Sequence, residues 1–215
     1  MNRFAVFTVS MLLTVLPARA HDKPTLGPAK DGKLRDELLA RVETDQKARN
    51  TMIEWQKKNG TGKLSMELQA EFEKILEVVT QADEANTKWL GGIIDKHGWP
   101  TITLVGKEGA FSVWLLVQHA DANPKFQRTC LDLMKKLPGT EINVTNVAYL
   151  TDRVLLAEGK KQLYGTQFTN NAGKWEPRPL EDADNVDKRR AEANLGPLAV
   201  YAKELEAMYG AAPKK

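Results

Sequence analysis

Two long stretches of the sequence carry apolar residues three and four positions apart, and this spacing sets the class of fold. It places side chains on one face of an α-helix, because a helix turns once in about 3.6 residues. The first stretch covers residues 34–58 and ends at the helix-breaking cluster Asn59-Gly60-Thr61-Gly62. The second follows Ser65, which can cap a helix, and extends to His97-Gly98. We therefore predict two long helices, the second weakened at Gly91-Gly92.

Shorter helical segments follow these two. The segment that begins near Gly106 and Gly109 is apolar on most sides, so we expect its helix to be central. Asn123-Pro124 supplies a cap and a first-turn proline for a fourth helix, which Pro138-Gly139 ends. Further helices are predicted from residue 143 or 145 to about 159, over 185–193 and over 197–208.

One segment alternates between apolar and polar residues instead. Gln162–Thr169 (QLYGTQFT) has this pattern, and the turn cluster 170–173 separates it from Lys174-Trp175-Glu176. The sequence thus predicts a mainly α fold, a single-domain helical bundle of about six to seven helices over residues 34–209, with one β-hairpin near 162–178.

The first 20 residues have the composition of a secretory signal peptide. A short polar, positive start precedes the apolar run Phe4–Leu16 and the small-x-small motif Ala18-Arg19-Ala20. The run is too short to span a bilayer comfortably, which disfavours the alternative of a membrane anchor. We expect cleavage after Ala20, a flexible leader over residues 21–33, a disordered tail over 210–215, and a periplasmic or secreted location.

Composition excludes some classes of partner. The formal net charge of +3 falls to +1 when Arg3 and Arg19 leave with the signal peptide, so we expect no attraction to nucleic acid. No later apolar segment is long enough to cross a bilayer, so no stable membrane insertion is expected after cleavage. Cys130 is the only cysteine, which excludes an intramolecular disulfide, and its place on an apolar stripe favours a buried thiol.

Polar residues interrupt the apolar stripes of the first three predicted helices. They are Asp45 and Arg49 in the first helix, Asp83 and Asn86 in the second, and Gln118 and His119 in the third. Burying such groups costs free energy unless they bond to one another. If the three stripes face one core, the six side chains form a connected network that either fixes the packing or forms the floor of a site.

Each of these residues has a purely structural alternative. Asp45 and Arg49 could be a half-exposed helix pair worth a few tenths of a kcal/mol. Asp83 could cap a break in the second helix. His119 lies near a helix C-terminus, where an imidazole can bond the last carbonyls. Asp121, two residues later, fits a turn better than a catalytic role.

Charged and amide groups in the second half of the sequence are further candidates for ligand binding. Arg153 follows an aspartate within a predicted helix, and Gln167 lies in the predicted hairpin. Arg189 and Arg190 are adjacent in a late helix and could clamp a carboxylate or phosphate. The alternative for the two arginines is a solvated basic face.

Five short strings together resemble an uncharacterised bacterial family of exported proteins classed as a domain of unknown function. They are GWPT (98–101), QHAD (118–121), LTDR (150–153), QLYGTQ (162–167) and VDKRR (186–190). The resemblance spans about Asp45 to Tyr201. It implies one domain and a bacterial envelope or secreted location, and it implies no ligand or catalytic residue.

Motifs for known cofactors and metals are missing from the sequence. The three histidines lack paired spacing, so we predict no metal site and no cofactor. Cleavage after Ala20 would make His21 N-terminal, and its amine and imidazole can chelate copper, but a second fixed histidine would have to reach this flexible leader. Two functions from different classes remain. The first is an exported domain whose polar centre binds a small ligand or an envelope protein. The second is a hydrolase-like enzyme with His119 as general acid/base, oriented by Asp45 or Asp83, and with Arg49 or Arg153 as anion clamp.

Overall fold

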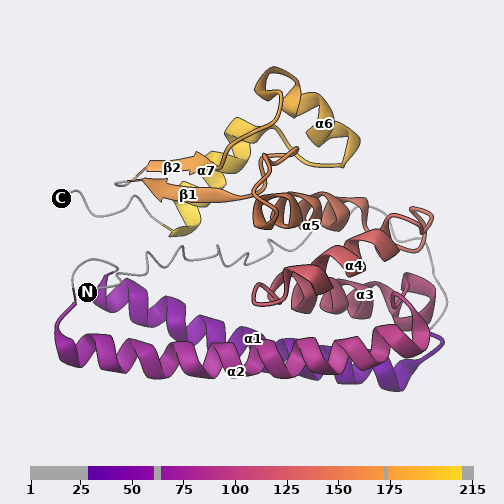
Figure 1. The fold of residues 1–215 in the computed structure, drawn as a ribbon, viewed down its shortest axis with the longest axis horizontal. Coiled ribbons are helices and arrows are strands. Elements are labelled where there is room, and N and C mark those ends of the chain that lie inside the picture. The colour runs from indigo at the N-terminus through magenta and orange to yellow at the C-terminus, as the bar shows by residue number, and fades with distance from the viewer. Residues whose placement is uncertain (1–28, 61–63, 172–173, 210–215) are drawn as a thin grey trace. The chain divides into compact units, whose positions relative to one another are not determined.

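The computed structural model describes residues 29–60, 64–171 and 174–209 (Figure 1). These residues form seven α-helices, one short 3-10 helix and one two-stranded sheet, which confirms the predicted mainly α fold with one hairpin. The predicted signal peptide, most of the leader and the tail lie outside the described residues. The chain divides into two compact units between Asn146 and Val147, and each is described by itself. The single domain over residues 34–209 therefore stays a prediction.

The first unit contains four helices. They are α1 (Gly32–Asn59), α2 (Met66–His97), α3 (Ile102–Gln118) and α4 (Pro124–Met134). The two long helices α1 and α2 lie side by side, and α3 contacts both of them (Figure 1). α2 stays helical through Gly91 and Gly92, where the sequence allowed a break. The flanking Leu90 and Ile94 are buried, and their packing outweighs the low helix propensity of glycine, about 1 kcal/mol per residue.

Two of the predicted caps fix where helices begin. The backbone N–H of Leu68 donates to Oγ of Ser65 at 3.3 Å, at the start of α2. The N–H of Phe126 donates to Oδ1 of Asn123 at 3.1 Å, at the start of α4. Each bond satisfies one of the N–H groups that have no partner inside the helix.

α3 is the most deeply buried helix of this unit, as its sequence predicted. It begins at Ile102 behind the N-cap Thr101, earlier than Gly106, where we expected its start. Gly106 instead interrupts the helix with a φ of 74°, a left-handed conformation that glycine adopts without a steric penalty. The buried run that follows, Val113–Val117, carries the chain through the core to His119, which is the C-cap of α3.

The second unit, from Val147 onward, holds most of α5 and all later elements. They are α5 (Val144–Ala157), β1 (Phe168–Asn171), β2 (Lys174–Pro177), η1 (Ala183–Asn185), α6 (Val186–Glu192) and α7 (Leu198–Tyr209). β1 and β2 are antiparallel, with Phe168 opposite Pro177. Phe168 packs in the core of this unit against Tyr201 and Leu205 of α7. The strands are shorter than the alternating pattern predicted, because residues 162–167 form a loop.

The buried carboxylate of Asp152, in α5, accepts hydrogen bonds from the backbone of this loop and holds its conformation. Its Oδ1 accepts the backbone N–H groups of Leu163 at 2.7 Å and Tyr164 at 3.0 Å. Its Oδ2 accepts both the N–H and the hydroxyl of Thr166 at 2.9 Å. Burial raises the pKa of Asp152 above its ordinary value, although these donors act in the opposite direction. One side chain therefore satisfies three backbone N–H groups that the sheet does not pair.

Arg190 of α6 donates hydrogen bonds to carbonyl groups of the same loop and of the segment between α6 and α7. Its NH1 donates to the carbonyl oxygens of Tyr164 at 2.7 Å and Gly165 at 3.3 Å, and its Nε donates to that of Gly196 at 2.6 Å. Its guanidinium also lies 5.2 Å from the ring centroid of Tyr201. With only 1% of its surface exposed, Arg190 joins the loop to α6 and α7.

Among the described residues, no helix combines the length and the apolar character that are needed to span a bilayer.

Candidate functional site

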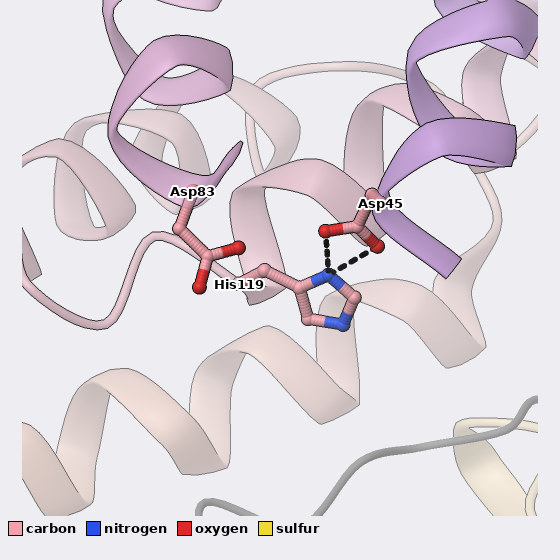
Figure 2. A group of neighbouring side chains, drawn as sticks. All are labelled: Asp45, Asp83 and His119. Atoms are coloured by element: carbon pink, nitrogen blue, oxygen red, sulfur yellow. Dashed lines mark hydrogen bonds and ion pairs between the residues drawn. The ribbon is translucent and has the colours of Figure 1, made fainter. Parts of the chain in front are cut away.

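An aspartate–histidine pair joins α1 to the end of α3 (Figure 2). Nδ1 of His119 lies 3.1 Å from Oδ1 of Asp45 and 3.0 Å from its Oδ2. Asp45 is 1% exposed and His119 is 8% exposed, so the pair is almost closed to solvent. The residues are 74 positions apart in the sequence and meet because α3 packs against α1.

Arg49 links this pair to α2. Its Nε donates to Oδ1 of Asp45 at 3.2 Å, and its NH2 donates to Oδ1 of Asp83. The Asp83 side chain is the most exposed of the four, at 21%. Three helices thus bring the predicted residues Asp45, Arg49, Asp83 and His119 into one connected set, which we call the polar centre.

The two carboxyl groups of the polar centre titrate in different ranges. Burial acts to raise the pKa of Asp45, but the hydrogen bond and charge of His119 and the charge of Arg49 hold it below its ordinary value. At Asp83 burial prevails over Arg49 and raises the pKa to about 6, with a further contribution from the negative charge of Asp45. Divergent pKa values within one cluster are typical of functional acid–base sites, although structural ion pairs also produce them.

A further polar contact, between Arg41 and Asn86, joins α1 and α2 near the polar centre. NH1 of Arg41 donates to Oδ1 of the predicted residue Asn86 at 3.2 Å, and its guanidinium stacks 4.1 Å from the ring of Trp89. Arg41 was not among the predicted site residues. The signal was present, because Arg41 lies four residues before Asp45 and shares its face of the helix.

The predicted residue Gln118 is buried at the end of α3. Gln127 of α4 secures this end of the helix, since its Nε2 donates to the carbonyls of Val117 at 3.1 Å and Gln118 at 3.2 Å. The same nitrogen donates to Oδ1 of Asp121 at 3.1 Å. Asp121 is exposed and lies in the turn between α3 and α4, where the sequence placed it.

The remaining predicted residues belong to the second unit. Arg153 and Gln167 are buried there, and Nε2 of Gln167 donates to the hydroxyl of Thr166 at 3.2 Å. Arg189 donates to the carbonyl oxygens of Leu163, Glu181 and Asp182. The two adjacent arginines therefore bond to backbone carbonyls rather than forming a solvated face, and their predicted role in ligand binding stays a prediction.

The polar centre has the donor atoms for two kinds of chemistry. Asp45 engages Nδ1 of His119, and Figure 2 shows Nε2 turned away from both carboxylates. A carboxylate on one ring nitrogen fixes the tautomer and orients the other nitrogen for proton transfer. In addition, Asp45, Asp83 and His119 each offer one ligand atom to a metal ion, and these atoms lie within 4.8 Å of one another. No short motif could reveal such a set, because its members come from three helices.

Comparison with curated proteins and with solved structures gives no match. One family model matches, and it covers residues 32–214, which include both compact units. The match therefore takes in the polar centre as well as the loop around Asp152. The chain belongs to this family, described as a family of unknown function (DUF6624).

Proposed function

We propose that the chain is an exported protein whose polar centre binds a small ligand. The observation that carries the proposal is the connected set of Asp45, Arg49, Asp83 and His119, in which buried charged groups lead to a carboxylate that is 21% exposed. Such an arrangement offers a ligand both opposite charges and hydrogen-bond partners in a largely water-excluded setting. The signal-peptide pattern of the first 20 residues supports the export part of the proposal.

Thermal-shift measurements on the mature chain test ligand binding. The panel contains amino acids, organic acids, sugars, short peptides and chloride salts of divalent metals. We expect at least one compound to raise Tm by about 5 °C, because saturation at a hundred times Kd adds about 2.7 kcal/mol of stability. Asp83→Asn removes this shift, whereas Asp95→Asn, an exposed acid on the same helix, retains it. The proposal fails if no compound stabilises the wild type, or if Asp83→Asn responds as the wild type does.

A second candidate function is a hydrolase-like activity with His119 as the general acid/base. The specific observation in its favour is the contact of Asp45 with Nδ1, which leaves Nε2 facing away from the two carboxylates. In this role Asp45 orients the imidazole and stabilises its protonated form, and Arg49 supplies positive charge nearby.

Three kinds of chromogenic substrate test this activity: 4-nitrophenyl acetate, 4-nitrophenyl phosphate and 4-nitrophenyl glycosides. If the chain hydrolyses one of them, His119→Ala lowers kcat/KM at least 100-fold, since general acid–base catalysis contributes about 10²–10⁴-fold. Circular dichroism of the same variant reports whether the fold is intact. His97→Ala, at the exposed end of α2, keeps the wild-type rate. Equal rates for wild type and His119→Ala exclude the role of His119. If none of the three kinds of substrate is hydrolysed, the result counts against the activity.

A further inference from the structure

We propose that Asp45, Asp83 and His119 form a binding site for a divalent transition-metal ion of the Zn²⁺, Co²⁺ and Mn²⁺ class. This inference rests on the proposed function, because it names the ligand of the same polar centre. It goes beyond the sequence, in which no spacing of histidines or acids predicts a metal.

The three side chains have a geometry close to that of a zinc site. Ligand atoms around a tetrahedral zinc ion lie about 3.4 Å apart, given bonds of about 2.1 Å. Nδ1 of His119 already lies 3.0 Å and 3.1 Å from the oxygens of Asp45, close to that separation. One donor atom from each of the three residues falls within 4.8 Å of the others, so a small movement of Asp83 completes the set. Asp83 is the most exposed of the three and is the one best able to move.

The charge of the polar centre favours a cation. Two carboxylates and one guanidinium leave one net negative charge when the imidazole is neutral, in a place where Asp45 is only 1% exposed. Unpaired negative charge is costly to bury, and this excess of carboxylate charge attracts a cation; a divalent ion changes the net charge of the polar centre from −1 to +1. A metal ion binds only an unprotonated ring nitrogen, so coordination replaces the hydrogen bond between Nδ1 and Asp45, and the proton of Nδ1 moves to Nε2 or to solvent.

Both carboxylates are already oriented by hydrogen bonds. Arg49 donates to Oδ1 of Asp45 and to Oδ1 of Asp83, and Nε2 of Gln46 donates to Oδ2 of Asp45 at 2.8 Å. Metal-binding carboxylates commonly have such outer partners, which hold them in place. Each carboxylate has about four lone-pair directions, so Arg49 can keep its bonds while another lone pair turns to the ion.

The donor set indicates the class of ion. An imidazole nitrogen with carboxylate oxygens suits zinc and the neighbouring transition metals, whereas calcium takes six to eight oxygen ligands and magnesium retains most of its water. Three protein ligands also leave a coordination position for water or a substrate.

Calorimetric titration with ZnCl₂ and visible absorption spectroscopy with CoCl₂ test the site. The full mature chain is used with His21→Ala as background, since a free N-terminal histidine can itself chelate a metal. We expect one ion per chain and a Co²⁺ absorption band that signals coordination by the protein. MgCl₂ and CaCl₂ bind at least tenfold more weakly than ZnCl₂.

Variants separate this site from adventitious binding. Asp83→Asn and His119→Ala each lower the Zn²⁺ affinity at least tenfold, and both are checked for folding by circular dichroism. Asp95→Asn and His97→Ala, exposed residues of α2, leave the affinity unchanged. Because His119→Ala removes a buried side chain, Asp83→Asn decides the question if the histidine variant does not fold.

The inference is overturned if the wild type binds no Zn²⁺, or if folded Asp83→Asn binds it with unchanged affinity. Its failure is distinguishable from that of the proposed function. An organic compound that stabilises the wild type but not Asp83→Asn, together with no effect of Zn²⁺, removes the metal and leaves the ligand site. If neither metals nor organic compounds bind, both proposals fail.

Discussion

Replacing Asp152 with alanine lowers the free energy of unfolding by about 4 kcal/mol, because each buried polar group left without a partner costs about 1–3 kcal/mol. The substitution removes the only side chain shown to bond the backbone N–H groups of Leu163, Tyr164 and Thr166 in the described structure. It also removes the acceptor of the Thr166 hydroxyl. Urea denaturation followed by far-UV circular dichroism measures the loss.

Two further variants make this test specific. Asp152→Asn keeps the shape and one oxygen acceptor but turns an amide nitrogen toward N–H donors, so we expect an intermediate loss of about 2 kcal/mol. Asp184→Ala, which removes an exposed acid from the same unit, changes stability by less than about 0.5 kcal/mol. A loss below 1 kcal/mol for Asp152→Ala, outside the range for unsatisfied buried groups, contradicts the role given to this carboxylate.

Replacing Arg49 with alanine has the second largest expected effect. It leaves Asp45 and Asp83 without the cation that bonds to both. Removing one partner of a buried ion pair costs about 3–5 kcal/mol of stability, because the other charge stays buried without compensation. Because Asp83 is 21% exposed and water can solvate part of its charge, we expect the lower end, about 3 kcal/mol. The measurement is again urea denaturation, at neutral pH.

A double variant separates lost charge pairing from lost packing. If the unpaired carboxylate of Asp83 causes the loss, adding Asp83→Asn to Arg49→Ala restores about 1 kcal/mol, as expected for residues that interact directly. Arg35→Ala, which removes a partly exposed arginine from the same helix, serves as the control and has little effect. No recovery in the double variant shows that Arg49 acts through packing of its side chain and not through its charge.

The helices were predictable because their information is local. The spacing of apolar residues and the caps Ser65 and Asn123 placed the starts of α2 and α4 correctly. The start of α3 was predicted too late, since the sequence pattern gave weight to Gly106 and not to the cap Thr101. The hairpin was predicted with strands that were too long. The alternating pattern does not show that residues 162–167 form a loop whose backbone N–H groups bond to Asp152.

Arg190 illustrates the limit of sequence patterns for single residues. Two adjacent arginines in a short helix are usually solvated. Arg190, however, is 1% exposed and donates hydrogen bonds to three carbonyl groups. The carbonyls belong to Tyr164, Gly165 and Gly196, and no spacing in the sequence links them to Arg190. Only the packing of α6 against the loop reveals the contact.

The sequence by itself determined which positions of each helix carry polar groups on an otherwise apolar face, because that property depends only on the helical period. It therefore identified Asp45, Arg49, Asp83 and His119 as unusual. The tertiary structure alone decided their partners: Arg49 bonds to an acid on each of two helices, and His119 meets a carboxylate 74 residues away. The physical reason is that the helical period fixes the direction of a side chain around its own axis, whereas a contact between helices depends on how their surfaces pack.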